Sequence, residues 1–254
     1  MFIFWGRKIV YRKIGYVADF CPICRSKQSF TLRRIGSASH VYYVSIGEGE
    51  LVGFDRTCMK CYIAFNADPN IYTSVSKTNE CIDTLTKLTF PVYEEVFQER
   101  LKIEAQLKNE PLSFSPQERH ALIRSPFLLL SPKVEKRFAS THIDKEVGLS
   151  LVSSVILLLL GPMLIRNLLP EYEENVIWVF LCISILLVAW QGVQSGRRFM
   201  RREVLPILAN TLQPLRPSEN EITDVIAELK QLRHKIGSKL LLSDLQSLLT
   251  LNRT

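Results

Sequence analysis

VGLSLVSSVILLLLGPMLI (residues 147–165) and VIWVFLCISILLVAWQGVQSG (residues 176–196) are two long apolar runs separated by a short acidic segment. Neither run contains a charged residue, and at about 1.5 Å per residue each can cross a hydrocarbon core of roughly 30 Å. Trp178 and Trp190 stand near the ends of the second run, where indole rings favour the headgroup level. The stretch predicts a transmembrane helical hairpin. The alternative, a buried hairpin in a soluble domain, would normally keep a polar stripe.

The charged residues beside the two runs predict their orientation. Three glutamates, Glu171, Glu173 and Glu174, lie between the runs, and four arginines follow the second one: Arg197, Arg198, Arg201 and Arg202. Because basic residues are retained on the cytoplasmic side, we expect both termini in the cytoplasm and a location in the bacterial inner membrane. The four arginines would then lie next to anionic lipid of the inner leaflet.

The lengths of the remaining segments predict an α+β membrane protein whose domains outside the hairpin are small. The chain has 254 residues and a net charge of +7, with +5 in residues 1–80, where eleven basic residues face six acidic ones. No segment outside the hairpin is long enough for a large enzyme core. The predicted parts are a zinc ribbon (1–80), a helical connector (81–146), the hairpin (147–196, spans 147–168 and 176–196) and a basic juxtamembrane segment with a helical tail (197–254).

Four of the six cysteines form two pairs of equal spacing, Cys21 with Cys24 and Cys58 with Cys61. In a reducing compartment such pairs favour metal binding over disulfides. Two residues between the sulfurs let each pair curl into a turn, and two turns supply the tetrahedral set of thiolates that Zn²⁺ takes. Such a closed site is structural, because zinc catalysis needs an exchangeable position. Iron in the same sulfur set and a redox dithiol are the alternatives.

The residues between the two cysteine pairs predict a small antiparallel sheet. Three segments are rich in β-branched and aromatic residues, and breaks are expected at 36–39 and 47–49. The predicted strands are Ser29–Ile35, His40–Ile46 and Glu50–Thr57. A sheet with a cysteine turn at each end has the plan of a zinc ribbon. His40 is a fifth candidate ligand, although a strand position is favoured, and Cys81 and Cys182 are interpreted as small apolar residues.

The segments Gly15–Phe20, leading into Cys21-Pro22-Ile23-Cys24, and Ser39–Val44 resemble a family of bacterial membrane proteins. Members of that family carry an N-terminal zinc ribbon ahead of two transmembrane helices. The resemblance implies fold and topology, and no reaction. Arg25 departs from the usual pattern, because a glycine often follows the second cysteine of a zinc knuckle.

The connector and the tail contain several helix signals. Ser115 with Glu118 predicts a capped helix through Arg124, and Pro126 and Pro132 are expected to bracket a short apolar segment. After Pro206, Pro214 and Pro217 break the chain, a capping box of Ser218 with Glu221 predicts an amphipathic helix ending at Gly237, and Ser243 with Gln246 starts another. The apolar stripes of these two helices must pack on each other, on the connector or on another protein.

Two functions follow from these features. The first is a membrane-anchored module that binds a protein partner, or a second copy, at the cytoplasmic face, with zinc as a structural element. The alternative is a membrane-tethered nucleic-acid-binding ribbon that uses the basic residues Arg25, Lys27, Arg33 and Arg34. Catalysis is not inferred, because the sequence has no HExxH motif, P-loop, dinucleotide-binding glycine motif or nucleophile elbow.

Overall fold

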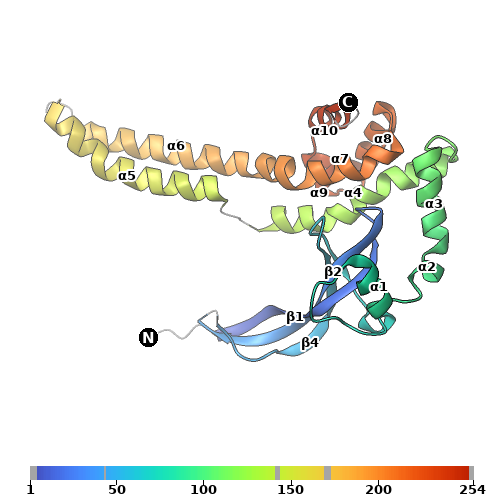
Figure 1. Ribbon diagram of the computed structural model, residues 1–254. Helices are drawn as coiled ribbons and strands as arrows, with labels where there is room; N and C mark the ends of the chain where they lie inside the picture. The colour runs from blue at the N-terminus through green and yellow to red at the C-terminus, as the bar shows by residue number, and fades with distance from the viewer. Residues whose placement is uncertain (1–4, 43, 141–143, 169–172, 252–254) are drawn as a thin grey trace. The chain divides into compact units, whose positions relative to one another are not determined.

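The computed structural model describes residues 5–42, 44–140, 144–168 and 173–251 (Figure 1). The chain divides into two compact units. The first comprises Met1–Leu122 with Asn210–Arg216, and the second Ile123–Ala209 with Pro217–Thr254. The predicted α+β class is confirmed, since the fold combines an antiparallel sheet with many helices.

The sheet belongs to the first unit and runs in the order β1-β2-β4-β5, with β3 beside β2. All of its pairings are antiparallel. The strands are β1 (Trp5–Cys21), β2 (Ser26–Val41), β3 (Val44–Ser45), β4 (Glu50–Cys58) and β5 (Ala64–Asn66). The predicted strands Ser29–Ile35 and Glu50–Thr57 lie within β2 and β4. The expected break at residues 36–39 is wrong, because β2 runs through it.

The longest strand, β1, was not among the predicted strands. Lysine and arginine residues interrupt its apolar pattern, and it owes its extended form to sixteen paired residues along β2. Gly15 permits a further contact, since a Cβ atom there would lie 2.3 Å from the carbonyl oxygen of Ser76. Tyr16 and Ser76 exchange two backbone hydrogen bonds at this point, of 2.7 and 3.0 Å. The absence of a side chain at residue 15 therefore lets a loop close against β1.

An aromatic core joins the sheet to the helices of the first unit. The Phe20 ring of β1 lies 5.6 Å from that of Phe97, which also contacts Phe90 and Tyr93. The Thr89 hydroxyl accepts a hydrogen bond of 2.9 Å from the Ala18 backbone N–H. Thr89 lies in α1 (Ile82–Thr89) and Tyr93 in α2 (Tyr93–Val96). The other short helices of this unit are η1 (Pro69–Ile71), α3 (Gln98–Asn109) and η4 (Gln213–Leu215).

The helix α4 (Pro116–Ala139) is longer than predicted. Ser115 and Glu118 form the expected capping box, in which the Glu118 carboxylate accepts from the Ser115 N–H at 3.0 Å. The predicted end at Arg124 is wrong, since α4 continues through Pro126 and Pro132. Each proline removes one helical hydrogen bond, and the burial of Phe127, Leu130 and Val134 offsets that loss.

The predicted hairpin corresponds to α5 (Lys145–Leu168) and α6 (Glu173–Phe199), which lie side by side (Figure 1). Small side chains form the seam between them: Ser150, Ser154 and Ser184 are buried. A Cβ atom on Gly161 would lie 2.7 Å from the Phe180 ring, so the backbone of α5 approaches α6 closely there. In contrast, a Cβ atom on Gly192 would have no other atom within 4 Å.

The chain does not break at Pro206. A π-helical turn, η3 (Met200–Val204), joins α6 to α7 (Leu205–Leu212), and the Leu205 N–H donates to the Met200 carbonyl. The wider turn carries the helix past the proline, which has no N–H to donate. The prediction of a break at Pro206 is therefore wrong.

The tail forms α8 (Glu219–Gln231), α9 (Lys235–Lys239) and α10 (Leu242–Leu251). The predicted capping box of Ser218 and Glu221 is present. The predicted end at Gly237 is wrong: α8 ends at Gln231, and Arg233, two residues beyond that end, has a left-handed φ of 61°. Arg233 N–H donates to Lys230 and His234 N–H to Leu229, which together make a Schellman cap. The apolar stripes of α8 and α10 are buried within the second unit.

Candidate metal centre

The four paired cysteines lie together at one end of the sheet. Cys21 ends β1 and Cys58 ends β4, and each is followed by a turn that carries the second cysteine of its pair. The strands place the two turns next to each other, because β1 and β4 both pair with β2, with Cys21 opposite Ser26 and Cys58 opposite Phe30. Two sites 37 residues apart in sequence are thus joined by the sheet.

The sulfur atoms have the spacing of a tetrahedral metal site. All four lie within 4.8 Å of one another. The Sγ atoms of Cys21 and Cys61 are 3.6 Å apart, and those of Cys24 and Cys58 are 3.9 Å apart. Zinc–sulfur bonds of about 2.3 Å in a tetrahedron imply sulfur–sulfur distances of about 3.8 Å. The residues present therefore fit a divalent metal, whereas a disulfide needs about 2.05 Å.

Backbone hydrogen bonds support both cysteine turns. The Cys24 N–H donates to Cys21 Sγ at 3.3 Å, and the Lys60 N–H donates to Cys58 Sγ at 3.4 Å. Such bonds stabilise sulfur in its thiolate form, the form that binds metal. Hydrogen bonding with the other three sulfurs raises the pKa of Cys21 and lowers the pKa of Cys58, so the cluster shares its protons. A bound cation would take the place of these protons.

The residue after each turn adopts a left-handed backbone conformation. Arg25 has a φ of 54° and Tyr62 a φ of 58°. Glycine adopts this conformation most easily, which explains its frequency at this position in zinc knuckles. The two turns are thus alike in geometry although neither contains the glycine.

Buried contacts hold the first turn against the rest of the first unit. Arg25 Nε donates to Glu104 Oε2 of α3 at 2.7 Å, and both side chains are less than a tenth exposed. The Thr211 hydroxyl donates to the Ile23 carbonyl oxygen at 3.0 Å. Thr211 lies near the end of α7 and belongs to the first unit, so this part of α7 supports the cysteine turn directly.

A second buried cluster near the site was not predicted. Asp19 is fully buried, and its carboxylate accepts hydrogen bonds from Arg56 and from the Tyr72 hydroxyl, the latter at 2.5 Å. Burial raises the pKa of Asp19, although the Arg56 guanidinium opposes that rise. The three residues come from β1, β4 and the end of η1. Their spacing in sequence carries no signal, since only the sheet brings them together.

Three other candidate residues lie outside the cluster. His40 lies in β2 and pairs with Gly6 of β1. Cys21 pairs with Ser26, fourteen residues before His40 along β2, so His40 is not near the sulfurs. Cys81 and Cys182 are exposed. Cys81 precedes α1 and Cys182 lies on α6.

The basic residues considered for nucleic-acid binding have partners within the first unit. Arg25 pairs with Glu104, and Arg33 makes two hydrogen bonds to Asp55, of 2.6 and 2.8 Å. Lys27 lies 3.2 Å from Asp83, and Arg34 donates to the Glu48 and Gly49 carbonyl oxygens. These contacts neutralise or occupy the groups that a phosphate backbone would need. Nucleic-acid binding by these residues stays a prediction.

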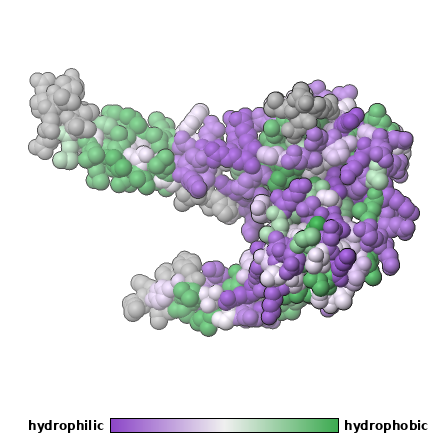
Figure 2. Space-filling view, in the orientation of Figure 1, coloured by the Kyte–Doolittle hydropathy of each residue, from purple (hydrophilic) through white to green (hydrophobic). Residues whose placement is uncertain are grey.

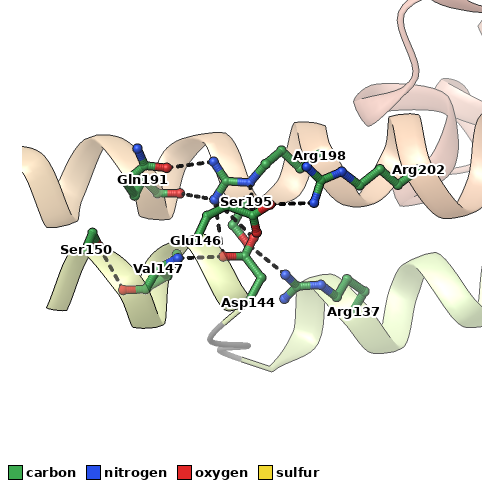
Figure 3. Close-up of polar contacts among 9 residues, drawn as sticks. All are labelled: Arg137, Asp144, Glu146, Val147, Ser150, Gln191, Ser195, Arg198 and Arg202. Atoms are coloured by element: carbon green, nitrogen blue, oxygen red, sulfur yellow. Dashed lines mark hydrogen bonds and ion pairs between the residues drawn. The ribbon is translucent and has the colours of Figure 1, made fainter. Parts of the chain in front are cut away.

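The arginines after the second apolar run also contact carboxylates (Figure 3). Arg198 donates to both oxygens of Asp144, at 3.1 and 3.2 Å, and to Gln191 Oε1 at 2.7 Å. Arg202 lies 2.5 Å from Glu146, and Arg201 lies 2.9 Å from Asp244. Burial alone would raise the pKa of Asp144, but hydrogen bonds from Val147 N–H, Ser195 and Arg198 lower it. Arg197 is exposed. Binding of anionic lipid by these residues stays a prediction.

One helix among the described residues is long and apolar enough to cross a membrane. It is the run Trp178–Leu215, with 38 residues, and 11 % of its most apolar stretch is buried. The prediction of two spans is thus supported for the second run only. The first run forms α5, and it exposes large apolar side chains such as Leu149 and Leu159. Figure 2 shows hydrophobic surface over the hairpin and hydrophilic surface at its base.

Comparison with known proteins assigns no family to the chain. No protein-family model, no curated protein and no solved structure matches it. The resemblance to two-span zinc-ribbon proteins is therefore supported only by the four-cysteine cluster and one apolar helix.

Proposed function

We propose that this protein is a membrane-anchored zinc-binding module that acts by binding a partner at the cytoplasmic face of the bacterial inner membrane. The observation that carries the proposal is the cluster of four sulfurs within 4.8 Å of one another, at the end of an antiparallel sheet. Four cysteines complete the coordination shell of Zn²⁺. A metal held in this way stabilises the fold and has no position for substrate or water.

The exposed apolar surface of α5 and α6 supports the membrane anchor. On α6, Trp178, Leu186 and Val193 are 66, 68 and 72 % exposed, which is costly in water and favourable in lipid. The spans we propose are 147–168 and 176–196, and the arginines after the second span favour cytoplasmic termini. A cytoplasmic ribbon would keep its cysteines reduced and able to bind metal.

A binding role agrees with the closed metal site, and the burial of the tail limits where a partner can bind. The stripes of α8 and α10 pack within the second unit, so they do not offer a free apolar face. The partner, whether another protein or a second copy, would bind another surface. Crosslinking in native membranes followed by mass spectrometry would identify it.

The zinc proposal is tested by the metal content of the purified full-length protein. We expect one Zn²⁺ per chain, its loss in Cys58→Ser, and its retention in the matched control Cys81→Ser, since Cys81 lies outside the cluster. Stripping the metal with a chelator should unfold the cysteine end of the sheet. Wild-type protein with no more zinc or iron than Cys58→Ser would overturn the metal site.

The anchor is tested by carbonate extraction of membranes and by cysteine labelling. We expect the chain to stay with the membrane pellet, and Cys81 to react with an impermeant thiol reagent only after the cells are opened. Recovery of the chain in the soluble fraction would refute the anchor. Labelling of Cys81 in intact cells would refute the proposed orientation.

A further inference from the structure

The end of the sheet away from the cysteines carries an exposed apolar face. Trp5, Val41 and Val44 lie in one row across β1, β2 and β3. Their exposed fractions are 83, 38 and 70 %. Directly opposed residues share one face of a sheet, so these three side chains form a continuous apolar row.

The same face continues along β1. Side chains alternate along a strand, so Ile9 and Tyr11 lie on the face of Trp5, and both are 47 % exposed. Figure 2 shows hydrophobic surface at this end of the sheet. We call the group of Trp5, Ile9, Tyr11, Val41 and Val44 the tip face. Large apolar side chains gathered in this way mark an interaction surface.

Positive charge accompanies the tip face. Arg7 and Lys13 alternate with its apolar residues on the same side of β1, and Lys8 and Arg12 lie on the other side. The sequence has no acidic residue before Asp19, and Asp19 is buried. Arg7 lies 3.5 Å from Glu50, and because both side chains are 74 % exposed, water screens that ion pair.

Aromatic and aliphatic side chains interleaved with basic ones match the chemistry of an anionic bilayer surface. Indole and phenol rings favour the headgroup region, and each nearby Lys or Arg adds attraction to anionic lipid. An added β-strand is a poorer fit, because lysine and arginine along an edge strand oppose pairing with another chain. Although β1 is an edge strand, the apolar side chains project from the face of the sheet and not from its hydrogen-bonding edge.

We infer that the tip face is a second membrane-binding surface, which lies in the headgroup region of an anionic bilayer. The inference rests on the proposed membrane anchor and adds a lipid contact made by the sheet itself. In this arrangement Trp5, Tyr11 and Val44 enter the interface while Arg7 and Lys13 contact lipid phosphates.

The chain permits a direct test, because its three tryptophans are Trp5, Trp178 and Trp190. In the full-length variant Trp178→Phe/Trp190→Phe, Trp5 is the sole tryptophan. After reconstitution into vesicles of phosphatidylcholine with phosphatidylglycerol, we expect blue-shifted Trp5 emission and quenching by brominated lipid. Replacing Arg7 and Lys13 with glutamine should reduce both effects, as should vesicles of phosphatidylcholine alone. The matched control Lys102→Gln/Lys108→Gln removes two exposed charges from α3 and should change neither.

The outcomes separate the tip face from the anchor. A chain that does not float with the vesicles refutes the anchor. A chain that floats while Trp5 stays open to acrylamide and unaffected by brominated lipid refutes the tip face alone. Trp5 emission that shifts with protein concentration, equally in detergent and in lipid, would assign the surface to a second copy and also refute it. Zinc content and circular dichroism verify that each variant is folded.

Discussion

Arg25 and Glu104 form a buried ion pair, with Arg25 Nε 2.7 Å from Glu104 Oε2 and both side chains less than a tenth exposed. The pair joins the residue after the first cysteine turn to the middle of α3. Arg100 also contacts the same carboxylate, at 3.0 Å. The helix thus holds the backbone of the cysteine turn in place through charge.

Removal of one member of this pair should destabilise the protein strongly. Glu104→Gln leaves the Arg25 guanidinium buried without its counter-charge, for which the expected cost is about 3–5 kcal/mol. Thermal unfolding of the zinc-loaded protein measures the loss. The control Asp83→Asn removes the exposed partner of Lys27 and should leave the melting temperature nearly unchanged. Equal effects of the two substitutions would contradict the structural role of Arg25.

The contact between Gly161 and Phe180 should be sensitive to side-chain size. A Cβ atom at residue 161 would lie 2.7 Å from the ring, so Gly161→Leu must separate α5 from α6, at a cost of about 1–3 kcal/mol. Gly192→Leu is the matched control, because nothing lies within 4 Å of the corresponding position. Thermal unfolding in detergent would compare them. A control that loses as much stability as Gly161→Leu would show that the seam is elsewhere.

The base of the hairpin should lose stability in acid through Asp144. Its pKa is lowered in the folded protein, so the ionised carboxylate is the stabilising form. The contribution is complete above the ordinary pKa of 3.8 and is lost as the pH falls through the lower folded value. We expect Asp144→Asn to melt below wild type at pH 5 to 8, and the difference to shrink below pH 3.8. A difference that grows in acid would reverse the sign and refute this account.

Substitutions at Arg233 and Gly237 test where the helix α8 ends. Arg233 is exposed with a φ of 61°, so Arg233→Gly should be neutral or stabilising, by up to about 1 kcal/mol. Gly237 is buried, and a Cβ atom there would lie 2.9 Å from Leu229 Cβ and from Lys230 N. Gly237→Ala should therefore destabilise by about 1–3 kcal/mol. Denaturant unfolding measures both changes in stability. If Arg233→Gly destabilised the protein more than Gly237→Ala, the result would support the predicted helix end at Gly237 instead.

Local sequence predicted features whose physical cause is local. The spacing of two residues in Cys21–Cys24 and Cys58–Cys61 is a property of a single turn, and the capping boxes at Ser115 and Ser218 need four consecutive residues. The apolar run of α6 can likewise be predicted from its length and composition alone.

The sequence alone determined the cysteine turns, the starts of α4 and α8 and the two apolar runs, because each arises from neighbouring residues. The tertiary structure decided the rest. The pairing of β1 with β2 made a strand of residues 5–21, and packing kept α4 helical through two prolines. The sheet also brought Asp19, Arg56 and Tyr72 together and placed the two cysteine turns within reach of one metal ion. Contacts between residues distant in sequence depend on pairing and burial, and neither is encoded in a short stretch of chain.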